Sequence, residues 1–129
     1  IYFFNEKYFV FDENGKIIDQ IYIKDFTNQS LLIFKGNSSN LKANSLINIL
    51  KNNDFEKKYQ IESLEFLNKR RWDINLYGDV KLLLSEEDPN KSIQNFIKIQ
   101  NKLSETDINN IKTYDLRNLK KTILINLND

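Results

Sequence analysis

Residues 71–84 read Arg-Trp-Asp-Ile-Asn-Leu-Tyr-Gly-Asp-Val-Lys-Leu-Leu-Leu, and this stretch decides the fold. From Trp72 to Leu76, apolar residues alternate with polar ones, which is typical of a strand with one buried face. The same alternation resumes at residues 80–84, after a turn at Gly78. Residues 61–67 show it too, just upstream. We therefore predict antiparallel strands at the centre of a half-buried sheet.

Further strands are indicated on both sides of this centre. Aromatic and β-branched residues at 7–11 and 16–18 flank an Asn14-Gly15 turn, the strongest short-range signal of a β-hairpin. The remaining expected strands are Leu31 to Lys35, closed by Gly36, and the final pair, Ile111 to Arg117 and Thr122 to Leu127.

Two segments have helical rather than alternating periodicity. Residues 41–52 place their apolar side chains on one face, with Ser39 or Asn40 as the expected N-cap. A second helix should run to about Leu103, with Asp88 as N-cap and Pro89 at the first helical position. The order of elements predicts an α+β fold, in which a mostly antiparallel sheet carries two main helices on one face. We expect residues 1–129 to form a single domain.

The composition excludes several classes of function. The chain has 129 residues, 40% of them apolar, and its formal net charge is +1. These values are typical of a globular domain and argue against a nucleic-acid-binding protein. The absence of His and Cys excludes a Ser-His-Asp triad, a cysteine nucleophile and an ordinary zinc site. We therefore expect a binding or scaffolding protein rather than an enzyme, without a cofactor or metal.

The absence of Met, and therefore of an initiator, indicates a processed or excised piece of a longer protein. A membrane anchor or a preceding domain would then lie upstream of this chain.

Two charged clusters have both a functional and a structural interpretation. The acids Glu86, Glu87 and Asp88 could act as paired carboxylates of a cell-wall hydrolase, but acids before a helix also complement its dipole and cap its free N–H groups. Lys69, Arg70 and Arg71 could bind phosphate groups, yet three charges also suit a solvated turn before a strand. We favour the structural interpretation of both clusters.

The closing strand, residues 122–127, suggests a binding function. It contains four apolar residues and neither a charge nor a proline. If it lies at an edge of the sheet, its unpaired N–H and C=O groups are a template for a strand of another protein. The alternative is that the strand lies inside the sheet, or that its edge is covered.

Five motifs in this order and spacing resemble one known family, the bacterial cell-division protein FtsQ, in its C-terminal β domain. The detail is most similar to alphaproteobacterial members. The motifs are Val10 to Gly15, Leu31 to Gly36, Arg71 to Leu82, Leu84 to Pro89, and Leu103 to Ile108 followed by Tyr114-Asp115-Leu116-Arg117.

This resemblance implies a non-enzymatic scaffold of the divisome at the division septum. The full-length protein would have one helix in the inner membrane and a POTRA domain before this periplasmic domain. It would bind FtsB and FtsL, with strand addition by FtsB onto the final strand, and so link them to the peptidoglycan synthases FtsW and FtsI. A POTRA-linked module for secretion or outer-membrane assembly is the alternative among scaffolds. The expected partner-binding residues are Arg117, Asn118, Lys120, Thr122, Ile123, Leu124 and Ile125.

Overall fold

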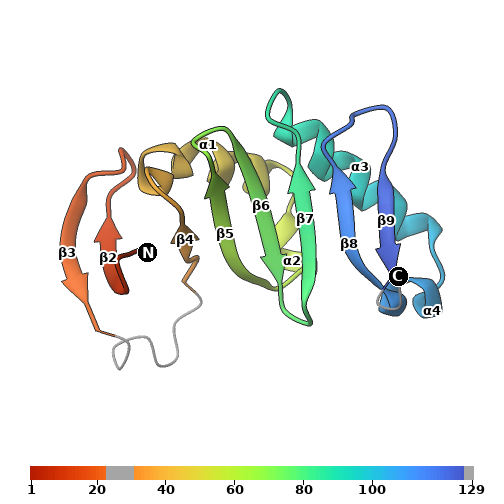
Figure 1. The fold of residues 1–129 in the computed structure, drawn as a ribbon, viewed down its shortest axis with the longest axis horizontal. Helices are drawn as coiled ribbons and strands as arrows, with labels where there is room; N and C mark the ends of the chain where they lie inside the picture. Colours follow the sequence, from red (N-terminus) through yellow and green to blue (C-terminus); the bar gives the residue numbers. More distant parts are fainter. Residues whose placement is uncertain (23–30, 127–129) are drawn as a thin grey trace.

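The computed structural model describes residues 1–22 and 31–126, which form one sheet of nine strands with four helices (Figure 1). Helices α1 and α3 lie behind the same face of the sheet (Figure 1). None of the described helices covers the other face, which we call the open face. The strands are β1 (Tyr2–Phe4), β2 (Lys7–Phe11), β3 (Ile17–Ile21), β4 (Phe34–Lys35), β5 (Ile61–Leu67), β6 (Arg71–Leu76), β7 (Val80–Leu84), β8 (Ile111–Leu116) and β9 (Ile123–Asn126). The helices are α1 (Ser39–Asn52), α2 (Phe55–Lys58), α3 (Pro89–Lys102) and α4 (Glu105–Asn110).

The strand order in the sheet is β3-β2-β1-β4-β5-β6-β7-β8-β9, so β3 and β9 are its two edges. Most neighbours are antiparallel, and the parallel pairs are β1–β4, β4–β5 and β7–β8. The expected α+β class with a mostly antiparallel sheet is therefore confirmed. The three parallel pairs were not predicted, because they join strands that are separated in sequence by a hairpin or by helices.

The hairpin predicted around Asn14-Gly15 is present as β2 and β3, and β3 runs on to Ile21. Its turn is held by Asp12, whose carboxylate accepts hydrogen bonds from the N–H groups of Asn14 and Lys16, both at 2.9 Å. The carbonyl of Gly15 accepts a further bond from the Asn40 side chain at 2.7 Å. That bond fixes the hairpin to the start of α1.

The central strands were also predicted correctly. Leu64 on β5 pairs with Ile74 on β6, which pairs with Leu82 on β7. All three side chains are fully buried against the helices. The core continues with residues from α1, α2, α3, β4 and β8, chiefly Phe34, Leu46, Leu50, Phe55, Ile93, Phe96, Tyr114 and Leu116.

The starts of the two long helices differ from each other. Asp88 caps α3 as expected, because its carboxylate accepts a hydrogen bond from the Lys91 N–H at 3.0 Å and Pro89 takes the first position. The N-cap predicted for α1 is wrong. Ser39 begins the helix, and the N-cap position belongs to Ser38, whose left-handed backbone makes no side-chain cap.

The predicted strand from Leu31 to Lys35 is shorter in the structure. Only Phe34 and Lys35 pair with neighbours, between β1 and β5. Gly36 follows at once with a φ of +100°, and a Cβ added there would lie 2.2 Å from the carbonyl oxygen of Phe66. The backbone at Gly36 therefore passes so close to the backbone of β5 that only glycine, which has no Cβ, fits there.

Strand β9 is described from Ile123 to Asn126, so the predicted strand begins one residue later, and its predicted end at residue 127 lies outside the described residues.

Candidate partner-binding edge and groove

Strand β9 forms one edge of the sheet and pairs only with β8 in the described part of the chain. Leu124 lies opposite the buried Tyr114 and packs against the core. Ile123 and Ile125 lie opposite Asp115 and Thr113, on the open face, and remain 50% and 41% exposed. The strand is therefore anchored on one face by a single leucine and presents two isoleucines on the other.

An open groove of about 590 Å³ lies at one end of the central strands, next to the segment that leads into β9. It is lined by four cationic residues, Arg70, Arg71, Arg117 and Lys120, and by two anionic ones, Glu86 and Glu87. Of the predicted binding residues, Arg117, Asn118 and Lys120 line this groove, while Ile123, Leu124 and Ile125 belong to the adjacent edge strand. Thr122 directly precedes that strand and is half-buried.

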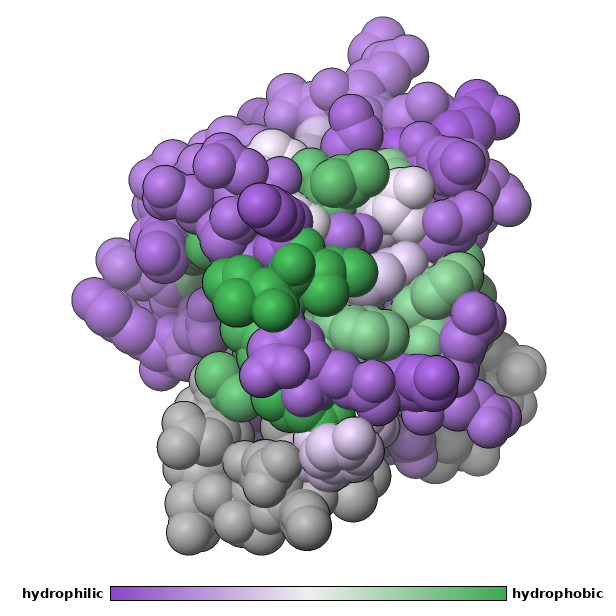
Figure 2. Space-filling view, turned by 90° about the vertical axis from the view of Figure 1, so that its left-hand side faces the viewer, coloured by the Kyte–Doolittle hydropathy of each residue, from purple (hydrophilic) through white to green (hydrophobic). Residues whose placement is uncertain are grey.

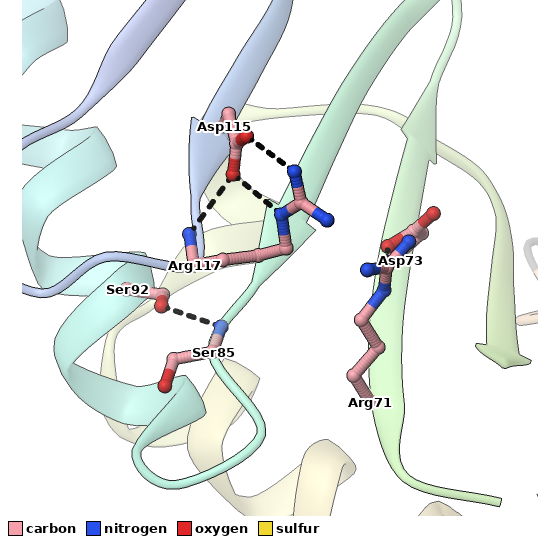
Figure 3. A network of polar contacts seen from close by, with 6 residues as sticks. All are labelled: Arg71, Asp73, Ser85, Ser92, Asp115 and Arg117. Atoms are coloured by element: carbon pink, nitrogen blue, oxygen red, sulfur yellow. Dashed lines mark hydrogen bonds and ion pairs between the residues drawn. The ribbon is translucent and has the colours of Figure 1, made fainter. Parts of the chain in front are cut away.

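Arg117 is held in place by Asp115. The guanidinium donates two hydrogen bonds to the carboxylate, from Nε at 2.9 Å and from Nη2 at 2.7 Å, and the Arg117 N–H adds a third at 3.2 Å. These bonds lower the pKa of the Asp115 carboxyl and raise the pKa of Arg117. Figure 3 shows that Arg117 points across β7 toward β6. One edge of the guanidinium is occupied, and the remaining N–H groups are free to meet a ligand in the groove.

A second Arg–Asp pair lies on the far side of β7, formed by Arg71 and Asp73 (Figure 3). Here Arg71 Nε is 3.6 Å from Asp73 Oδ1, too far for a hydrogen bond. From the sequence we interpreted residues 69–71 as a solvated turn. The structure confirms this for Lys69 and Arg70, which are exposed in the turn before β6, whereas Arg71 is the first residue of that strand. Arg70 and Arg71 also line the groove with Arg117, and Arg70 pairs with Glu86 at 3.2 Å. The signal that could have found Arg71 is its strand spacing, since it shares a face of β6 with Asp73.

The acids at 86–88 have the structural role that the sequence favoured. Asp88 caps α3, Glu86 pairs with Arg70, and all three side chains are exposed at the surface. Asn118 also has a local role, because its side-chain oxygen accepts a hydrogen bond from the Lys120 N–H at 2.9 Å. A hydrogen bond between two of its own residues therefore stabilises the loop that precedes β9.

The floor of the groove is tied to α3 through Ser92, which is fully buried. Its Oγ accepts a hydrogen bond from the Ser85 N–H at 2.9 Å (Figure 3) and donates one to the Leu116 carbonyl at 2.8 Å. Ser85 follows β7 and Leu116 ends β8, so one hydroxyl fixes the ends of both strands. Arg117 directly follows Leu116, and its position depends on this link.

We expect Ser92→Ala to lower the free energy of unfolding by about 2 kcal/mol, because it leaves a buried N–H and a buried carbonyl without partners. Urea denaturation followed by circular dichroism would measure the change. Ser45→Ala is the matched control, since Ser45 is exposed on α1 and its hydroxyl bonds only to the Lys42 carbonyl of its own helix. The control should change stability by less than about 0.5 kcal/mol. Equal effects of the two substitutions would contradict this role of Ser92.

The described residues contain no group of three or more Asp or Glu side chains able to hold a metal ion. Within residues 1–22 and 31–126, no helix is long and apolar enough to cross a membrane.

Comparison with known proteins identifies the family of the chain. A search among curated proteins finds no match. The family model described as "Cell division protein FtsQ/DivIB, C-terminal" matches residues 3–117, which include most of β1 and all of β2 to β8, and end at the groove residue Arg117. Because this match covers most of the 129 residues and agrees with the fold, the chain belongs to the FtsQ/DivIB family of cell-division proteins, as its C-terminal domain.

Proposed function

We propose that this domain is a non-enzymatic scaffold of the divisome, which binds the FtsB–FtsL pair by accepting a strand of FtsB at β9. Membership of the family gives the chain a role in cell division. In the full-length protein, on this proposal, the domain lies in the periplasm at the septum, next to the inner membrane. It would link FtsB and FtsL to the peptidoglycan synthases FtsW and FtsI.

The observation that carries this proposal is the outer edge of β9, with which no strand of the described residues pairs, together with its two exposed isoleucines. Residues 123–126 contain neither a charge nor a proline, two features that often protect an edge from pairing. A partner strand added there would gain ladder hydrogen bonds from the backbone and apolar contacts from Ile123 and Ile125.

The opposite edge of the sheet is less suited to accept a strand. It also exposes apolar side chains, Ile17, Ile18 and Tyr22, and Figure 2 shows a small hydrophobic area on that side of the molecule within a hydrophilic surround. However, β3 carries a charge in its middle, at Asp19, whose carboxylate accepts a hydrogen bond from the next N–H, of Gln20, at 2.8 Å. A charge on an edge strand disfavours pairing with another chain.

The groove beside β9 would supply specificity. Its cationic residues lie where a strand paired with β9 would leave the sheet, next to residues 117–120. Arg117 is rigidly held by Asp115 and keeps N–H groups available, so it suits a bidentate or shared bond to a carboxylate of the partner. We therefore expect the FtsB segment to carry an acidic residue at the end of its added strand that lies beside this groove.

The test is a titration of the 129-residue chain with the periplasmic C-terminal segment of FtsB from the same organism, followed by calorimetry and by amide hydrogen exchange. Strand addition should slow the exchange of β9 amides while the amides of β3 exchange as before, because only paired N–H groups are protected. Binding with protection at β3, or with none at either edge, would contradict the proposal. So would a folded chain that binds no FtsB segment.

A further inference from the structure

Asp73 is the one acidic residue of the described sheet that is buried without full hydrogen bonding. It belongs to the Arg-Trp-Asp motif at the start of β6, and its side chain is 3% exposed although it lies on the open face. Its Oδ1 has no hydrogen-bond partner, and neither has the buried Nε of Arg71. Leaving both atoms unsatisfied costs free energy, so the pair calls for an explanation beyond stability.

Asp73 lies in a dense arrangement of charges. Glu65 on β5 and Leu83 on β7 lie directly opposite it in the sheet, and the cationic side chains of Arg71, Lys81 and Arg117 act on its carboxylate. Beyond Leu83, in the same row of the sheet, lies Asp115. Burial raises the pKa of the Asp73 carboxyl in spite of the three cations, whereas the bonds from Arg117 lower the pKa of Asp115.

The contact with Asp73 affects which nitrogen atoms of Arg71 are available to a ligand. A guanidinium is planar, with Nε on one edge and the two Nη groups toward the other. Because Nε is the atom nearest to Asp73, the Nη groups are left for the groove that Arg71 lines. Arg117 also has an aspartate beside it, Asp115, on the other side of β7, although that contact consists of hydrogen bonds (Figure 3). The two arginines thus face one groove, each with an aspartate behind it.

We propose that Asp73 is a positioning residue, which turns Arg71 so that its Nη groups bind a carboxylate of the partner strand in the groove. This inference rests on the proposed function and adds a second arginine and its supporting aspartate to the binding site. The 3.6 Å separation in the free domain leaves room for the pair to tighten when a partner covers the groove and excludes water.

The first test is a double-mutant cycle with the same FtsB segment. Asp73→Asn should weaken binding about tenfold, and it should have almost no further effect in the Arg71→Ala background, because it acts through that arginine. Glu65→Gln is the matched control, since it removes the same charge from the position directly opposite on β5. The control should change binding by less than about twofold. Independent, additive effects of Asp73→Asn and Arg71→Ala would overturn the proposal.

The second test is the dependence of binding on pH. Protonation of Asp73 removes the charge that orients Arg71, so wild-type binding should weaken as the pH falls through the raised pKa of this carboxyl. The partner's own carboxylates also titrate, but the difference between the wild type and Asp73→Asn isolates Asp73. Parallel pH profiles of the two proteins would overturn the positioning role.

The third test needs no partner and separates this inference from the proposed function. In the free chain, NMR can follow the exchange of the Arg71 Nε proton with water. Its rate should rise about tenfold or more in Asp73→Asn and stay unchanged in Glu65→Gln, because only the first substitution removes the anion that holds the buried Nε of Arg71 in place. An unchanged rate in both variants would overturn the inference. If the rate rises but the wild type binds no FtsB segment, the proposed function fails while the positioning of Arg71 stands.

Discussion

Ile125→Pro is expected to abolish the binding of the FtsB segment, with a loss of affinity of more than about a hundredfold. Proline has no N–H to donate, and its ring disturbs the strand geometry on both sides. Ile125 lies inside β9, opposite Thr113, and its side chain is well exposed. The substitution therefore removes one backbone bond and deforms the edge, while the fully buried core is left intact. Calorimetry would measure the loss, and circular dichroism would show that the fold is retained.

Two control variants make this result specific to the edge. Ile125→Val keeps the backbone N–H and most of the apolar side chain, so its binding should stay within about threefold of the wild type. Ile18→Pro introduces the same residue at the opposite edge strand, where Ile18 is likewise exposed, and should leave binding unchanged. Loss of binding in Ile18→Pro, or wild-type binding in Ile125→Pro, would contradict strand addition at β9.

Gly36→Ala is expected to destabilise the domain by about 3 kcal/mol or more, from a left-handed backbone that disfavours a Cβ and from a steric clash. The clash is with the backbone oxygen of Phe66, which cannot move aside without shifting the central strand β5. Gly78→Ala is the matched control, since Gly78 also has a positive φ, +89°, but its Cβ would meet no atom within 4 Å.

The control should lose only about 1 kcal/mol, the cost of the left-handed backbone alone. Denaturation in guanidinium chloride would compare the two variants. Similar losses would show that the backbone of β5 yields to the added methyl group, and that the close crossing at Gly36 is not a constraint on the fold.

Much of the fold could be predicted from local patterns. The Asn14-Gly15 turn, the alternation from Trp72 to Leu76 and the Asp88-Pro89 helix start each depend on neighbours in sequence, and the structure confirms all three. The strand β1 and the helices α2 and α4 were missed. They have three, four and six residues, too few to show a period. The strand β1 and the helix α2 also pack against distant parts of the chain, whereas α4 has no buried residue and begins at a local cap, Ser104.

The candidate site could be predicted only in part. The edge position of β9 agrees with the hypothesis drawn from its uncharged sequence, whereas the groove brings together Arg71 and Arg117 from strands that are not neighbours. No local pattern carries that information. Asp73 was placed correctly on the polar side of its strand, but its burial was not foreseen. The cationic side chains that act on its carboxylate, Arg71, Lys81 and Arg117, come from different parts of the sheet, and their arrangement depends on the order of strands.

The paired arrangement of Asp73, Asp115, Arg71 and Arg117 has a consequence for the speed of complex formation. The electrostatic potentials of two anions and two cations on one small surface cancel at distances beyond the Debye length, which is about 8 Å at physiological ionic strength. The group can therefore hold a carboxylate at contact distance without attracting one from afar. Added salt should speed the release of a bound acidic strand while it leaves the rate of encounter nearly constant, the reverse of an electrostatically steered complex.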